Sequence, residues 1–130
     1  WTLSRDSAIK YYSGTAVYSK VFILKKETLN NAIWLDLGEL HDLASIKING
    51  VDFGVIWTNP YLINISSAIV TGKNVLEIAV TNTWANRLKG DHDLPLQKRI
   101  TQTTAPYHLE RSELLPAGLI GPVIIQKEIK

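Results

Sequence analysis

Hydrophobic and polar residues alternate along several short stretches of the chain. The strictest case is residues 33–37, where Ile33, Leu35 and Leu37 are separated by single residues before Gly38. Because successive side chains of a strand point to opposite faces, this pattern predicts a half-buried strand whose apolar side chains face the core.

Two further stretches, residues 16–24 and 75–80, are rich in β-branched and aromatic residues and follow the same pattern. In the first, the pattern can place Val17, Val21 and Ile23 on one face. The second follows a predicted turn at residues 72–74. The side chains expected in the core are Leu35, Leu37, Ile46, Ile48, Leu76, Ile78, Val80 and Val123.

Asn49 and Gly50 separate two of these stretches, residues 46–48 and 51–57. This dipeptide tolerates the positive φ that a type I′ turn requires at both of its central positions. The sequence therefore predicts a tight β-hairpin.

Strand signals recur about every ten residues without an amphipathic helix between them, which favours an all-β antiparallel sandwich or jelly roll. The helix candidates, residues 39–43 and 66–70, have the length of single turns. A last strand is expected at residues 121–125, with Pro122 at its first position or at a sheet edge. Residues 83–118 are mostly polar and contain three prolines, so we expect a functional site there.

Composition and charge argue against several classes of protein, including nucleic-acid-binding and membrane-spanning proteins. The chain has 130 residues, 45% of them hydrophobic, which predicts one compact domain. Its formal charge of +2 comes from scattered side chains, so we expect no nucleic-acid partner. No apolar run approaches the ~20 residues that cross a bilayer, so we expect no membrane span. The chain begins at Trp1 and contains no Met, which suggests a module of a longer polypeptide.

The sequence contains little evidence for a catalytic site. A glycosidase needs two carboxyl groups, one of them kept protonated, and the best candidates are Asp91 and Asp93. The neighbouring Arg87 and Lys89 would favour their ionised forms, and loop acids commonly cap turns or pair with bases. The three His residues lack the spacing of a zinc site. Asp91 and Asp93 remain weak candidates for a structural calcium ion, and no other cofactor is expected.

Binding residues are easier to nominate. The rings of Trp57, Tyr61, Trp84 and Tyr107 could stack on sugars or cap the core. A sharper candidate is an amide and guanidinium cluster that could hold hydroxyl groups or a partner's carboxylate. Its members are Asn82, Asn86 and Arg87.

Several short motifs, in this order, resemble the sugar-binding domain of family 2 glycoside hydrolases. They are Asn49-Gly50, Gly54, Pro60, Asn64-Ile65 and Gly72-Lys73-Asn74-Val75-Leu76. Residues 11–16, 82–91 and 118–123 are similar to the C-terminal sandwich of α-L-rhamnosidase-like proteins of family 106. The resemblance implies a galactose-binding-like jelly roll from the C-terminal part of a larger protein, which is secreted, periplasmic or on the cell surface.

In such enzymes the catalytic carboxylates lie on a separate domain, so the resemblance implies a non-catalytic accessory module. Its expected partner is the catalytic domain of the parent chain, with residues 82–91 as the docking face and carbohydrate as a secondary ligand. An independent carbohydrate-binding module and an unrelated adhesive or structural sandwich are the alternatives.

Overall fold

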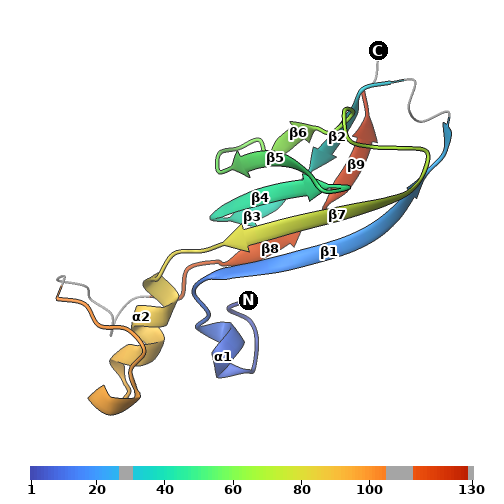
Figure 1. Cartoon of the computed structure of the whole chain (residues 1–130). Helices are drawn as coiled ribbons and strands as arrows, with labels where there is room; N and C mark the ends of the chain where they lie inside the picture. The colour runs from blue at the N-terminus through green and yellow to red at the C-terminus, as the bar shows by residue number, and fades with distance from the viewer. Residues whose placement is uncertain (27–30, 105–112, 129–130) are drawn as a thin grey trace. The chain divides into compact units, whose positions relative to one another are not determined.

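The computed structural model describes residues 1–26, 31–104 and 113–128, which divide into two compact units (Figure 1). The first unit is Trp1–Gly14 with Asn82–Ala117, and the second is Thr15–Thr81 with Gly118–Lys130. The elements are α1 Ser7–Lys10, β1 Thr15–Leu24, β2 Ile33–Asp36, β3 Glu39–His41, β4 Leu43–Ile48, β5 Val51–Ile56, β6 Leu62–Asn64, β7 Gly72–Thr81, α2 Ala85–His92, η2 Leu96–Lys98, β8 Gly118–Gly121 and β9 Ile124–Lys127.

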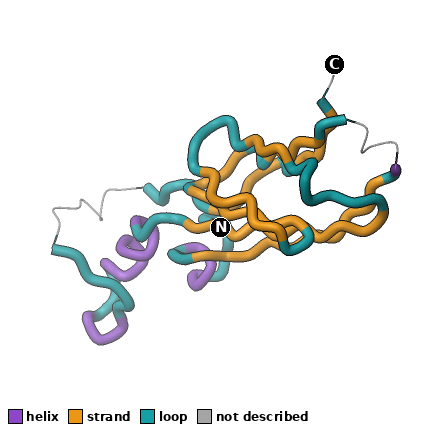
Figure 2. The backbone as a smooth tube through the Cα atoms, turned by 45° about the horizontal axis from the view of Figure 1, so that its top comes forward, coloured by secondary structure: helices purple, strands orange, loops and turns teal. Residues whose placement is uncertain are grey.

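Antiparallel strands build the second unit. Its first sheet has the order β1-β7-β4-β5, and its second sheet has the order β6-β2-β9. β3 and β8 form a separate antiparallel pair. The tube in Figure 2 shows these strands in orange, with the helices α1 and α2 of the other unit in purple. The all-β antiparallel sandwich expected from the sequence is confirmed.

The core of this unit forms where the inward side chains of the two sheets meet. Ile33 and Leu35 lie in β2 of the second sheet, Leu37 follows directly after β2, and Ile46 and Ile48 come from the first sheet; all five are 0% exposed. Leu76, Ile78 and Val80 are buried as well, so the alternation in the sequence placed these strands correctly.

One apolar assignment needs correction. Val123 was expected in the core but is 39% exposed, because it lies in the break between β8 and β9. Val17, Val21 and Ile23 share one face of β1, as the alternation predicted, and that face is exposed. The opposite face carries Tyr18 and the other half-buried side chains of the strand.

The predicted hairpin is confirmed between β4 and β5. Asn49 has φ 51° and Gly50 has φ 82°, the positive values that a type I′ turn requires. The Asn49 side chain also connects the turn to two neighbouring segments, because its Nδ2 donates to Ala68 O and its Oδ1 accepts from Val75 N. The turn is thereby fixed against β7.

Asn74 was expected in a turn but lies inside β7, which begins at Gly72. Its side chain is completely buried and makes four hydrogen bonds to described residues. Its Nδ2 donates to Val70 O and Gly72 O, and its Oδ1 accepts from Val70 N and Asn49 Nδ2. A buried amide is tolerated here because all of its hydrogen-bonding groups are used.

The helices lie outside the ranges expected from the sequence. Residues 39–43 belong to β3 and β4, and residues 66–70 form a turn and an irregular segment. Helix α2 carries no apolar stripe and contains Asn, Gly and Asp, which are poor helix formers. Contacts with distant segments of its own unit stabilise it, as described below. A single domain over residues 1–130 stays a prediction.

Candidate functional site

The segment expected to be functional, residues 82–91, begins with Asn82, whose side chain forms hydrogen bonds to the backbone of another segment of the same chain. Asn82 is 8% exposed, and its Oδ1 accepts from Gly14 N at 2.9 Å. Its Nδ2 donates to Tyr12 O at 2.8 Å. Asn82 and both partners lie in the same compact unit, so Asn82 ties the start of its second segment, residues 82–117, to residues 12–14.

Asn86, in the first turn of α2, has a comparable role. Its Nδ2 donates to Leu115 O and its Oδ1 accepts from Leu115 N, both at 2.8 Å. This pair of bonds copies the pattern between two strands, and Asn86 is buried. The amide therefore anchors residues 113–117 to the helix.

Arg87 and Asp91 form a buried ion pair one helical turn apart. Asp91 Oδ1 accepts from Arg87, and its Oδ2 accepts from Ile100 N, Thr101 N and Thr101 Oγ1. The Arg87 guanidinium carbon also lies 6.0 Å from the centre of the Tyr11 ring. Asp91 is 1% exposed and links α2 to residues 100–101, while its partner Arg87 links the helix to Tyr11, all within one unit.

The chemistry of Asp91 follows from these contacts. Burial raises the pKa of its carboxyl group, but hydrogen bonds from the Thr101 hydroxyl and amide and the Arg87 cation outweigh burial, so the pKa is lowered. A general acid for glycoside cleavage needs the opposite shift. The geometry suits Asp91 to a structural role.

Of the nominated aromatic residues, two present their rings to solvent. Trp84, at the start of α2, is 63% exposed, and Trp57, just after β5, is 69% exposed. Tyr61 is half-buried, and its carbonyl accepts from Leu37 N. Tyr107 lies outside the described residues. A role of these residues in docking or sugar binding stays a prediction.

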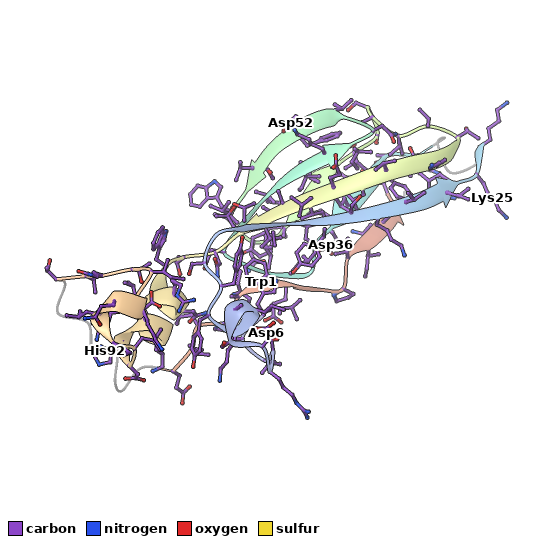
Figure 3. All side chains as sticks on the ribbon, turned by 60° about the horizontal axis from the view of Figure 1, so that its bottom comes forward. Trp1, Asp6, Lys25, Asp36, Asp52 and His92 are labelled. Carbon is purple, nitrogen blue, oxygen red and sulfur yellow. The ribbon has the colours of Figure 1, made fainter. Side chains whose placement is uncertain are left out.

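The remaining acidic side chains give no convergent site in the described part of the chain. Asp36 and Asp52, labelled in Figure 3, accept hydrogen bonds from Gly38 N and Gly54 N, so each one caps a turn two residues later. Asp93 is exposed. Among the described residues, no three His, Cys, Asp or Glu side chains lie close enough to hold a metal ion together.

The outward face of the first sheet carries an apolar row that the sequence analysis did not identify. Cross-strand pairing aligns Val17 with Ala79, Ala79 with Ser45, and Ser45 with Val55. Val17 and Val55, at the two ends of this row, are 63% and 58% exposed. The signal was present in Val17, Val21 and Ile23, which alternation placed together without saying which face is covered. We call Val17, Ala79, Ser45 and Val55 the apolar row.

The comparisons with known proteins agree on one family. The model of the family described as "Glycosyl hydrolase 2 galactose-binding domain-like" matches residues 4–114. A rhamnosidase structure from Novosphingobium sp. PP1Y is 44% identical with a TM-score of 0.85, and the match covers 95% of this chain but 12% of that one.

Two further relatives show the same disproportion in length. A Formosa agariphila protein with the name "Putative beta-glucuronidase" is 38% identical over 96% of this chain, which spans 13% of that protein. The β-D-glucuronidase of Dictyoglomus thermophilum is 25% identical with a TM-score of 0.57, and the match covers 62% of this chain and 14% of that one. No helix among the described residues is long and apolar enough to cross a membrane.

Proposed function

Because this chain belongs to the glycosyl hydrolase 2 galactose-binding domain-like family, we propose that it is a non-catalytic accessory module of a larger glycoside hydrolase. Its role is to pack against a neighbouring domain of the same polypeptide and to shape the rim of the catalytic site there.

The observation that carries the proposal is the disproportion in length. A match that covers 95% of this chain accounts for 12% of the rhamnosidase. A glycosidase needs two suitably placed carboxyl groups, and the carboxyl group of Asp91 is buried and bound internally by Thr101 and Arg87. These features together support a module whose parent carries the catalytic groups elsewhere.

The apolar row supports a docking role. The row crosses four neighbouring strands of the first sheet, carries no charged residue and has an exposed valine at each end. Exposed apolar surface commonly marks an interaction site. The exposed Trp84 ring is a second contact candidate, because Trp is enriched where interfaces concentrate their binding energy.

Substitutions in the apolar row test the docking role. Val17→Lys combined with Val55→Lys should lower the melting temperature or the activity of the parent polypeptide, while the isolated 130-residue chain melts nearly as before. Ile120→Lys is the matched control, since Ile120 is also exposed but lies in β8. Equal effects of both variants on the parent would contradict docking through the row.

Assays of the isolated chain test its lack of catalysis. We expect no turnover of aryl glycosides, including α-L-rhamnoside and β-galactoside, above the buffer blank. Asp91→Asn and Asp93→Asn should leave this baseline unchanged. Turnover that either substitution removes would overturn the accessory role.

Carbohydrate binding is the second candidate, and the exposed Trp57 ring favours it. An aromatic face suits the apolar face of a sugar ring, and Trp57 is 69% exposed. Affinity electrophoresis against a panel of polysaccharides, with Trp57→Ala as the comparison, distinguishes sugar binding from docking alone. Sugar binding would be supported if a polysaccharide in the gel slows the migration of the unsubstituted 130-residue chain and Trp57→Ala abolishes this effect.

A further inference from the structure

The inward side of the second unit contains an apolar groove of about 510 Å³. It lies between the first sheet and the β8–β9 segment, and every residue that lines it belongs to this one unit. Its apolar lining includes Tyr18, Phe22, Leu76, Ile78, Leu119 and Ile125.

The cover over the first sheet decreases from β7 to β1. Leu76 and Ile78 of β7 are 5% and 2% exposed, and β8 contacts β7. On β1, by contrast, the inward Tyr18 and Phe22 are half-buried and Lys20 between them is exposed. The groove therefore marks the place where the second sheet ends before the first sheet does.

Both strands beside the groove are sheet edges among the described residues. β1 is the last strand of the order β1-β7-β4-β5, and β9 is the last strand of the order β6-β2-β9. An edge strand has a row of backbone N–H and C=O groups available to pair with another strand. Ile125 of β9 faces the groove, since its partner in the β2 register is the buried Leu35.

We propose that the groove holds a β-strand from a part of the longer polypeptide outside residues 1–130, and that this strand pairs with the free edge of β9. The added strand extends the second sheet over the inward face of β1. Its alternate side chains are apolar and pack on Tyr18 and Phe22. The side chain that meets Lys20 is acidic or polar, because Lys20 lies between Tyr18 and Phe22 on the same face of β1.

The choice of occupant rests on the proposed function and on two features of the groove. The parent is long enough to supply a strand, since the module spans 13% of the Formosa agariphila relative. A free edge beside an apolar wall matches the backbone and the alternating side chains of a strand. A sugar needs several converging polar groups, whereas the polar groups on the wall come from residues 18–20 on one strand.

Peptide binding to the 130-residue chain tests the proposal. Synthetic peptides of twelve residues that tile the parent outside residues 1–130 serve as probes. We expect one peptide with alternating apolar positions to bind and to slow hydrogen exchange of the amides in residues 124–127. Phe22→Asp should weaken this binding at least tenfold. Val21→Asp is the matched control, because Val21 is the next residue of β1 but lies on its opposite, exposed face.

Hydrogen exchange on the whole parent gives an independent measurement. The amides of β9 should exchange more slowly in the parent than in the 130-residue chain. Equal exchange in both, or peptide binding that Phe22→Asp does not alter, would overturn the proposal. A dimer of the 130-residue chain that Phe22→Asp dissociates would assign the groove to a second copy and also overturn it. The apolar-row variants change residues outside the groove. If the strand proposal is wrong, the accessory role therefore remains to be tested by those variants.

Discussion

Tyr11 packs directly against the backbone of Gly90 in α2. A Cβ atom added to Gly90 would lie 2.5 Å from Tyr11 Cγ and 2.8 Å from Tyr11 Cβ. No side chain larger than hydrogen fits at this distance without a shift of the ring. The Arg87 guanidinium lies near the same ring, so the tyrosine positions the helix through two of its residues.

Gly90→Ala should therefore destabilise the protein although alanine is the better helix former. Propensity alone would favour alanine by about 1 kcal/mol, but overpacking of this kind costs typically about 1–3 kcal/mol. We expect a net loss of free energy of unfolding, measured by urea denaturation. Tyr11→Ala in the same chain removes the ring atoms from the clash but keeps Cβ of residue 11, so Gly90→Ala should cost clearly less in that background. The same loss in both backgrounds would contradict the packing argument.

Asp91→Asn should be strongly destabilising at neutral pH. It leaves a largely buried Arg87 without its ionised partner, and breaking a buried pair costs about 3–5 kcal/mol. Asp93→Asn, which changes an exposed acid two residues later, is the control and should have little effect.

The effect of Asp91 should depend on pH in a definite direction. Its folded-state pKa is lowered, so its contribution is complete above the unfolded-state value of about 3.9 and disappears as the pH falls through the folded-state pKa. The difference in unfolding free energy between the original chain and Asp91→Asn should shrink in acid. A difference that grows below about pH 4 would contradict the lowered pKa.

Asn74→Ala should destabilise the sandwich by about 2–4 kcal/mol, because it leaves buried groups around Val70 and Gly72 without partners. Chemical denaturation measures the loss. Lys73→Ala, which truncates the adjacent exposed side chain, should change stability by less than about 0.5 kcal/mol. Similar values for both variants would rule out the buried amide as the cause.

Gly50→Val tests the hairpin through backbone conformation alone. A Cβ atom on Gly50 would meet nothing within 4 Å, but the φ of 82° is strained for a β-branched residue. We expect a loss of about 1–2 kcal/mol in thermal or chemical unfolding. Gly50→Asn should cost less, since asparagine tolerates positive φ, and a larger loss for asparagine would contradict this account.

Alternation of apolar residues was sufficient to predict the strands and most of the core. The residues from Ile33 to Leu37 and from Leu76 to Val80 obey a period of two that only a strand with one covered face explains. Asn49-Gly50 likewise predicted its hairpin, because the positive φ of a type I′ turn is a local requirement. Local geometry determines these features, so local sequence reveals them.

The side of β1 that faces the core could not be read in the same way. Both of its faces carry apolar residues, and Val17, Val21 and Ile23 lie on the exposed one. Alternation shows which side chains share a face, but the opposing sheet decides which face is covered. The apolar row and the groove both result from this arrangement.

The amino-acid sequence by itself determined the family, the strand class and the hairpin, while tertiary structure decided the hydrogen-bond partners of the polar residues around α2. Asn82, Asn86 and Asp91 were candidates for a docking surface because their segment is polar. Their partners are Tyr12, Leu115 and Thr101, at sequence separations of 70, 29 and 10 residues. A polar side chain binds whatever the fold brings within hydrogen-bonding distance, and sequence does not encode that distance locally.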